Sequence, residues 1–338
     1  MQQNIVLTGD RPTGPLHLGH FVGSIRNRLS LQEKDKQFLM VADLQALTDH
    51  AREPEKVREA VFGVTLDNIS CGVDPKKTVI FIQSQIPEIQ ELAFIFMNLV
   101  SVTRLEQNPT VKTEMKQKGM KDIVPAGFLV YPISQAADIL SFKADFVPVG
   151  EDQLPMIEQT NEIVERFNNY YPATPLVFKK VKALVPNEGE GRLPGIDGKA
   201  KMGKSLGNAI YLSDSAREVE KKVMQMYTDP GHIHASDPGK IEGNIVFTYL
   251  AIFDPDQDAV TELKNKYQKG GLGDVEIKKR LIKVLNDTLE PIRIKRENLL
   301  KDKDFVRNVL KEGTEKAKDI VRQTFEEVNR AVKINYFT

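Results

Sequence analysis

Short apolar runs alternate with amphipathic stretches over the first half of the chain. Residues 5–7, 37–43 and 78–82 predict buried strands, because each run is short and rich in β-branched or large apolar side chains. Pro54 and Pro87 each open a stretch with apolar residues at helical spacing, the second reaching Val102. Strands that alternate with helices in this way predict an α/β fold with a parallel sheet covered on both faces.

Regularity then fades over residues 172–206, and helical spacing dominates from Asp214 onward. Only residues 245–253 carry a competing strand pattern in the second half. We therefore expect a sheet domain over 1–210, with an insertion at about 104–130, and a helical domain over 211–338. The last helix could stay in that domain or pack back on the first.

The composition is that of an ordinary globular protein, with 338 residues, 41% apolar and 28% charged. Its net charge of zero argues neither for nor against a polyanionic partner. Cys71 is the only cysteine, which excludes an intrachain disulfide, and no cluster of residues has metal-ligand spacing. With no secretory signal and no apolar run of about 18 residues, we expect a cytosolic protein without a membrane span.

A glycine-rich corner, residues 9–20, joins the first strand to the helical pattern that follows it. A helix N-terminus beside such a corner presents unsatisfied backbone N–H groups and positive dipole charge to an anion. His17 and His20 are three positions apart, so on a helix they share one face. We expect this corner to bind the phosphates of a nucleotide.

Residues 198–205 match the P-loop pattern G-x-x-x-x-G-K-[ST], which would place Lys204 on a phosphate. Residues 245–254 could then serve as the apolar strand that ends in a magnesium-binding aspartate. However, a P-loop needs a strand directly before it and a helix directly after it, and residues 192–195 and 206–208 predict neither. A P-loop NTPase is the alternative function from a different class.

The run Lys201-Met202-Gly203-Lys204-Ser205 resembles the Lys-Met-Ser-Lys-Ser loop of class I aminoacyl-tRNA synthetases, and His17-Leu18-Gly19-His20 is similar to their His-Ile-Gly-His motif. The pair suits adenylate formation, in which negative charge builds on the departing pyrophosphate. Lysines on a closing loop can stabilise that charge more strongly in the transition state than in the ground state.

Within this class the chain resembles the tryptophanyl enzymes of bacterial type. The resemblance rests on Pro12-Thr13-Gly14, on residues 136–140 and 147–153, and on the lysine loop. It implies a Rossmann-type catalytic domain with an appended helical anticodon-binding domain, and activation of L-tryptophan by ATP with Mg²⁺ for transfer to tRNA(Trp). It also implies a homodimer, for which the apolar helix over residues 92–100 is a candidate interface, although the same apolar pattern fits a buried core helix equally well. A tyrosyl-tRNA synthetase is the second alternative.

The resemblance also assigns the site residues. An aspartate at the position of Asp138 would bind the indole, and a carboxylate is a suitable acceptor for an N–H group that can only donate. The remaining tryptophan-site candidates are Tyr131, Gln135, Gln153, Leu7, Gln45, Val147 and Val149. The ATP candidates are Arg11, Pro12, Thr13, Gly19, His20, Gly150, Glu151, Asp152, Leu193, Lys201, Met202, Gly203, Lys204 and Ser205. The catalytic candidates are His17, His20, Lys201, Lys204 and Ser205.

Three positions depart from the commoner bacterial pattern of this family. Arg11 stands where glutamine is frequent, His20 where asparagine is frequent, and Gly203 replaces the first loop serine. We expect activity to survive, because both loop lysines are retained.

Overall fold

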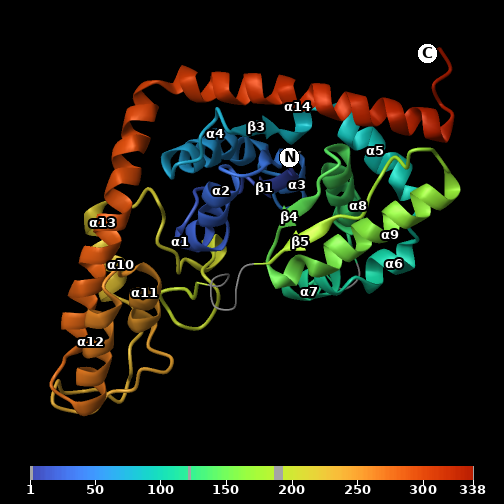
Figure 1. The fold of residues 1–338 in the computed structure, drawn as a ribbon. Helices are drawn as coiled ribbons and strands as arrows, with labels where there is room; N and C mark the ends of the chain where they lie inside the picture. Colours follow the sequence, from blue (N-terminus) through green and yellow to red (C-terminus); the bar gives the residue numbers. More distant parts are fainter. Residues whose placement is uncertain (1–2, 121–122, 186–192, 338) are drawn as a thin grey trace. The chain divides into compact units, whose positions relative to one another are not determined.

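The computed structural model describes residues 3–120, 123–185 and 193–337 (Figure 1). The chain forms two compact units. The sheet unit comprises Met1–Gly14, Arg26–Asn187 and Lys303–Thr338, and the helical unit comprises Pro15–Ile25 and Glu188–Asp302. Within the described residues, no helix is both long and apolar enough to cross a bilayer.

The described part of the sheet unit contains one parallel sheet with the strand order β3-β2-β1-β4-β5. Its strands are β1 (Ile5–Asp10), β2 (Lys36–Val41), β3 (Thr78–Ile82), β4 (Phe146–Pro148) and β5 (Lys182–Leu184). This arrangement confirms the predicted α/β class. The short strand β5 lies within the stretch predicted to be irregular, where its three residues pair with β4.

Helices cover this sheet. They are α2 (Arg26–Leu31), α3 (Asp43–His50), α4 (Pro54–Ser70), α5 (Pro87–Met97), α6 (Val102–Gln107), α7 (Pro109–Gln117), α8 (Ala126–Ser141), α9 (Leu154–Tyr170) and α14 (Lys303–Val332), with 3₁₀ turns η2 (Gln83–Gln85) and η3 (Glu151–Gln153). The expected continuation of α5 to Val102 is wrong. Ser101 accepts a hydrogen bond from the backbone of Arg104 and so starts a separate helix.

The last helix packs on the sheet unit, along the edge strand β3 (Figure 1). Gly313 allows this approach, since a Cβ atom there would lie 2.0 Å from the carbonyl oxygen of Ile80. One residue later, the hydroxyl of Thr314 accepts a hydrogen bond of 3.2 Å from the backbone N–H of Ile82. The helix therefore covers part of the strand edge that would otherwise be left unpaired.

The helical unit contains α1 (Leu18–His20), the π-helical turn η1 (Phe21–Ile25), the 3₁₀ turn η4 (Lys204–Leu206), and the helices α10 (Ala216–Met224), α11 (Ile245–Phe253), α12 (Gln257–Lys269) and α13 (Asp274–Lys301). The possible strand over 245–253 is wrong, because Asn244 caps α11 and that apolar run is buried as a helix. Residues 15–25 and 193–210 group with these helices, whereas the sequence placed them before a boundary at 210.

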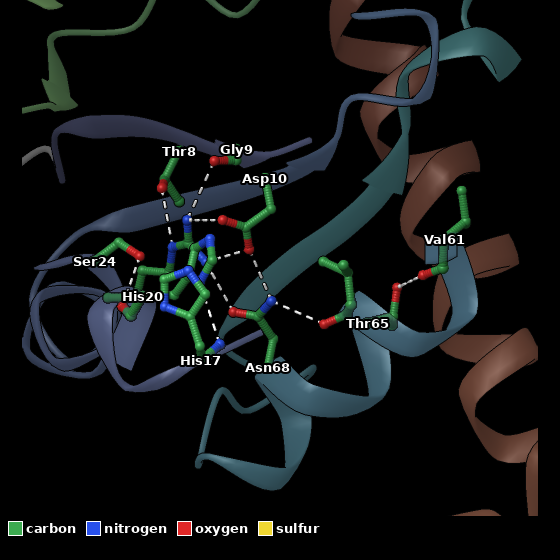
Figure 2. A network of polar contacts seen from close by, with 11 residues as sticks. Thr8, Gly9, Asp10, His17, His20, Ser24, Val61, Thr65 and Asn68 are labelled. Atoms are coloured by element: carbon green, nitrogen blue, oxygen red, sulfur yellow. Dashed lines mark hydrogen bonds and ion pairs between the residues drawn. The ribbon is translucent and has the colours of Figure 1, made fainter. Parts of the chain in front are cut away.

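A buried arginine fixes the end of β1 (Figure 2). Arg28 on α2 is 1% exposed and donates to both carboxylate oxygens of Asp10, at 2.6 and 2.8 Å. It also donates to the hydroxyl of Thr8 and to the side-chain oxygen of Asn68, whose own N–H group donates to Asp10. Because each member has partners, the corner after β1 starts from a rigid, charge-balanced position.

Replacing Arg28 with methionine should destabilise the sheet unit by about 3–5 kcal/mol, because Asp10 would be left as a buried charge without its cation. Urea denaturation followed by circular dichroism measures this loss. Lys77→Met, which removes an exposed partner of Glu33, is the matched control and should change little. Equal effects of the two substitutions would contradict a structural role for the Arg28 network.

Candidate nucleotide and amino-acid site

The strands β2 and β3 are added on one side of β1, and β4 and β5 on the other. The carboxyl ends of β1 and β4 therefore form a topological switch point, where α/β proteins bind ligands. Arg11, Pro12 and Thr13 follow β1, and residues 150–152 follow β4. Gly150 makes room for the carboxylate of Asp152, which would lie 2.7 Å from a Cβ atom at that position. The structure thus brings the ATP candidates of the sheet unit to one edge of the sheet.

Asp138 is fully buried on α8, and Gln83 supplies its hydrogen bonds. The amide of Gln83 donates to the two carboxyl oxygens at 2.8 and 2.9 Å, and its carbonyl accepts from the backbone N–H of Gln45 at 3.2 Å. The pKa of Asp138 is raised to about 8, mainly by burial; the bond from Gln83 opposes this shift, and the negative charge of Asp43 contributes to it. The sequence analysis missed Gln83, although a polar residue directly after a strand was a usable signal.

The raised pKa of Asp138 makes the folding stability depend on pH. The folded state holds the Asp138 proton up to about pH 8, whereas an unfolded aspartate releases it near its ordinary pKa of 3.8. The stability contributed by that bound proton is therefore complete at low pH and is lost as the pH rises through 8. A partner that donates a hydrogen bond to the ionised carboxylate would restore part of the stability that is lost when Asp138 ionises.

The other tryptophan-site candidates fall into three groups. Leu7 and Val147 lie in the main apolar core, with Val149 packed against it. Tyr131 instead belongs to a separate apolar cluster with Val111, Phe128 and Met156. Burial, with Glu114 nearby, raises the pKa of its hydroxyl, which therefore stays protonated. Gln45, Gln135 and Gln153 are half-buried. Gln45 is linked to Asp138 through Gln83, which hydrogen-bonds to both residues.

In the helical unit, His17 caps the short helix α1, as labelled in Figure 2. Its ring Nδ1 accepts from the backbone N–H of Gly19 at 3.1 Å, and its own backbone N–H donates to the Nδ1 of His20 at 3.2 Å. The two ring centroids are 3.9 Å apart. The two rings lie close together, as predicted, although His17 precedes the helix as its cap rather than lying within it. Each ring accepts a hydrogen bond from a backbone N–H group at the helix start.

Backbone pairing ties this corner to the segment that follows the lysine loop. The N–H of Leu18 donates to the carbonyl of Ile210 at 2.9 Å, and the N–H of Leu212 donates to the carbonyl of Leu16 at 3.0 Å. His17 and Tyr211 form the bridge between these two bonds. The two sequence motifs, more than 180 residues apart, therefore lie in one compact unit.

The lysine loop is a hairpin rather than a P-loop. The N–H of Met202 donates to the carbonyl of Leu193 at 3.0 Å, and Pro194 pairs with Lys201. Both Leu193 and Met202 are buried. Only one 3₁₀ turn, η4, follows Gly203, and α10 begins at Ala216. The side chain of Ser205 lies outside the described part of the structure.

Asn208 braces this hairpin, a role that the sequence did not reveal. It is buried, its side-chain oxygen accepts from the N–H of Gly203 at 2.9 Å, and its amide donates to Asp197 at 3.0 Å. Gly195 is required opposite it, because a Cβ atom there would lie 2.0 Å from the Asn208 amide nitrogen. The two lysines thus extend from a loop with a fixed base.

Electrostatics link the loop to the histidines. The pKa of His17 is lowered to about 3, mainly by burial and in addition by the charges of His20, Lys204 and Lys201. Lys201 and Lys204 therefore act on the same imidazole, which stays neutral at pH 7. A concentration of cations next to a helix N-terminus is suited to an anionic ligand with several charges.

Comparisons with known proteins agree with this geometry. A family model described as tRNA synthetases class I (W and Y) matches residues 1–290. A tryptophan–tRNA ligase from Clostridium longisporum is 55% identical over 100% of this chain and 99% of its own length. One from Streptococcus pneumoniae is also 55% identical, over 100% of both chains.

The chain belongs to the tryptophan–tRNA ligase family.

A solved member of the tryptophan–tRNA ligase family, the Campylobacter jejuni enzyme complexed with ADP and tryptophan, has a TM-score of 0.85 and 30% identity over 97% of this chain and 99% of its own. The tyrosyl-tRNA synthetase from Archaeoglobus fulgidus, complexed with L-tyrosine, reaches a TM-score of 0.64 at 21% identity, over 87% and 90%, and so shows a shared fold only. Neither the tyrosyl alternative nor the P-loop NTPase is favoured.

The depressed pKa of His17 predicts how acid affects stability. Between pH 6.5 and about 3, an unfolded histidine binds a proton that the folded chain excludes, so the stability present above pH 6.5 is lost as the pH falls through this range. His17→Asn keeps a side-chain acceptor for the Gly19 N–H group but cannot titrate. Its unfolding free energy should fall less between pH 6.5 and 4 than that of the wild type. Parallel pH profiles would contradict a buried neutral His17.

Proposed function

We propose that this chain catalyses the reaction of its family, in which ATP activates L-tryptophan and the tryptophanyl group passes to tRNA(Trp). The observation that carries the proposal is the pairing of residues 16–18 with 210–212, which keeps two histidines and two lysines in one unit. Amino-acid activation is an in-line attack by a carboxylate on the α-phosphate of ATP, so stabilisation of the pyrophosphate leaving group is its main demand.

The helical unit supplies the groups for this phosphate chemistry. Lys201 and Lys204 neutralise charge that grows on pyrophosphate in the transition state, with Met202, Gly203 and Ser205 as the remaining loop contacts. The Nδ1 atom of neutral His17 accepts from the backbone N–H of Gly19, so the ring proton is on Nε2. This Nε2–H group can donate to a phosphate oxygen. His20 and Gly19 complete the helix terminus. Mg²⁺ accompanies the nucleotide, held by phosphates and water.

The sheet unit supplies recognition of tryptophan and of the rest of ATP. Ionised Asp138, oriented by Gln83, accepts from the indole N–H group. A ring without this donor leaves the buried carboxylate one hydrogen bond short, which gives strong discrimination against phenylalanine. Arg11, Pro12 and Thr13 bind ATP from the β1 end, and Gly150, Glu151 and Asp152 from the β4 end. We further propose a cytosolic protein whose helices α10–α13 bind the anticodon arm.

Exchange of radiolabelled pyrophosphate into ATP, assayed with each of the twenty amino acids, tests the proposal directly. We expect exchange that depends on tryptophan and Mg²⁺, followed by charging of tRNA(Trp). Exchange supported by tyrosine would favour the tyrosyl enzyme. ATP hydrolysis without any amino acid would overturn the assignment.

Replacing Lys204 with alanine should lower the kcat of exchange by about 10²–10³, because an interaction with the leaving group is lost in the transition state. The dissociation constant of tryptophan should stay unchanged. Lys199→Ala, an exposed lysine of the same loop, is the control and should retain activity. Equal losses of kcat and tryptophan affinity would contradict the proposed role.

Tryptophan binding should release a proton at pH 7. Free Asp138, with its pKa of about 8, is mostly protonated at this pH, whereas the indole N–H group favours the carboxylate. Affinity should therefore rise from pH 6 to 8 and level off above. Calorimetry in buffers of different ionisation enthalpy measures the released proton, and Asp138→Asn should abolish both effects. Proton uptake on binding would contradict the assignment.

We also propose that the chain is a homodimer, through the outer face of α5 and the start of α6. Leu92, Ala93 and Phe96 of α5 are buried, whereas Phe94 on the same helix is 69% exposed. Met97 and Val102 continue this exposed apolar face. A contiguous apolar patch of this kind marks an interaction surface.

Phe94→Asp should convert the dimer to a monomer, because two carboxylates would be buried at a self-complementary interface. Sedimentation velocity measures the change. Ile294→Asp, which places an acid on an exposed apolar position of α13, is the matched control. A wild-type chain that sediments as a monomer would overturn the dimer.

A further inference from the structure

Helix α7, within the predicted insertion, is fastened firmly at its first turn. Asn108 is fully buried, caps α7, and donates to the side-chain oxygen of Gln159 on α9 at 2.7 Å. Thr110 donates to the backbone carbonyl of Asp152 at 2.8 Å. Just before them, Arg104 makes a bidentate ion pair with Glu162. These contacts fix the start of α7 to the turn that follows β4.

The far end of α7 is held much more weakly. Lys118, the residue that ends this helix, forms an ion pair with Asp49 at the end of α3, with its ammonium group 4.8 Å from the ring centroid of Phe128. The Lys118 side chain is 32% exposed, and solvent-exposed ion pairs are individually weak. This one contact can therefore open without unfolding the anchored end.

The inner face of α7 covers the Tyr131 cluster. Val111 is a buried member of that cluster with Tyr131 and Phe128, and Met115 and Met120 pack against it. Unbranched methionine side chains adapt to changes in packing. On another side, a cavity of about 420 Å³ is lined by Glu106, Lys112, Met115, Lys116, Gly119 and Met120. The helix therefore has adaptable contacts and adjacent space in which to move.

Asp49 has a second cationic partner from the nucleotide corner. The guanidinium of Arg11 lies 3.3 Å from the carboxylate of Asp49, so Arg11 and Lys118 share one anion. Two cations that share a carboxylate repel each other, and each weakens the other's hold. When the phosphates of ATP attract Arg11, the full charge of Asp49 becomes available to Lys118.

We propose that Asp49 is a positioning residue that couples the binding of ATP to the retention of tryptophan. Its carboxylate holds Lys118, and this contact keeps α7 closed over Tyr131. Arg11 competes with Lys118 for the same carboxylate. This inference rests on the proposed function, in which Arg11 binds ATP, and on the sequence-based assignment of Tyr131 to the tryptophan site. ATP then strengthens the Lys118–Asp49 contact and slows the escape of tryptophan. By linkage, bound tryptophan strengthens the binding of ATP by the same factor.

The chain contains no tryptophan, so the fluorescence of bound L-tryptophan, excited at wavelengths that tyrosine does not absorb, can be followed without tryptophan emission from the protein. Stopped-flow displacement gives its dissociation rate, with and without a non-hydrolysable ATP analogue. Asp49→Asn and Lys118→Met should raise the rate without nucleotide by roughly twofold to fivefold, as expected for the loss of a weak ion pair. Asp49→Glu should restore a rate close to that of the wild type.

The decisive comparison is the direction in which Arg11→Gln changes the dissociation rate of tryptophan, again without nucleotide. Removal of the competitor should slow tryptophan release below the wild-type rate, opposite to Asp49→Asn, although both substitutions remove the same ion pair. Lys116→Met, an exposed lysine of α7, is the matched control and should behave as the wild type.

Faster release in Arg11→Gln, or equal rates in Asp49→Asn and Lys116→Met, would overturn the coupling while leaving tryptophan binding by the wild type intact. A wild-type chain that binds no tryptophan would instead overturn the proposed function and this inference together.

Discussion

Two backbone hydrogen bonds, from Leu18 to Ile210 and from Leu212 to Leu16, are the constraint on which the phosphate chemistry depends. They join a corner near the start of the chain to the segment behind the lysine loop. Without them, the lysines would reach the histidines only after an entropically costly search through a flexible loop. With them, both motifs belong to one compact unit, and the loop needs to move only over a short range.

Two clusters of buried polar groups, one at the end of β1 and one between η2 and α8, serve different purposes. Arg28 and Asp10 neutralise one another with two hydrogen bonds between them, so they can be rigid and remain charged. Asp138 is paired with the amide of Gln83 rather than with a cation in the described part of the chain, so in its buried position the carboxyl favours the proton. The first arrangement stabilises the corner after β1. The second provides a carboxyl whose ionisation a hydrogen-bond donor can favour.

The sequence predicted the sheet and the chemistry of the site through signals that are local in the chain. Apolar runs such as residues 78–82 identified the strands, and the Lys201–Ser205 loop with the His17–His20 turn indicated the family. It did not predict Gln83, Asn208 or Arg28, because their roles come from partners as far as 55 residues away along the chain. Residues 245–253 are apolar throughout, so periodicity could not separate a strand from a buried helix.

Amide hydrogen exchange at Leu18 and Leu212 tests the central constraint most directly. We expect both amides to be protected to the same degree in the free protein, because each opens only when the pairing opens, and to gain protection together when ATP is added. Exchange of Leu18 at the rate of an unstructured peptide, or a response to ATP at one amide without the other, would contradict the account.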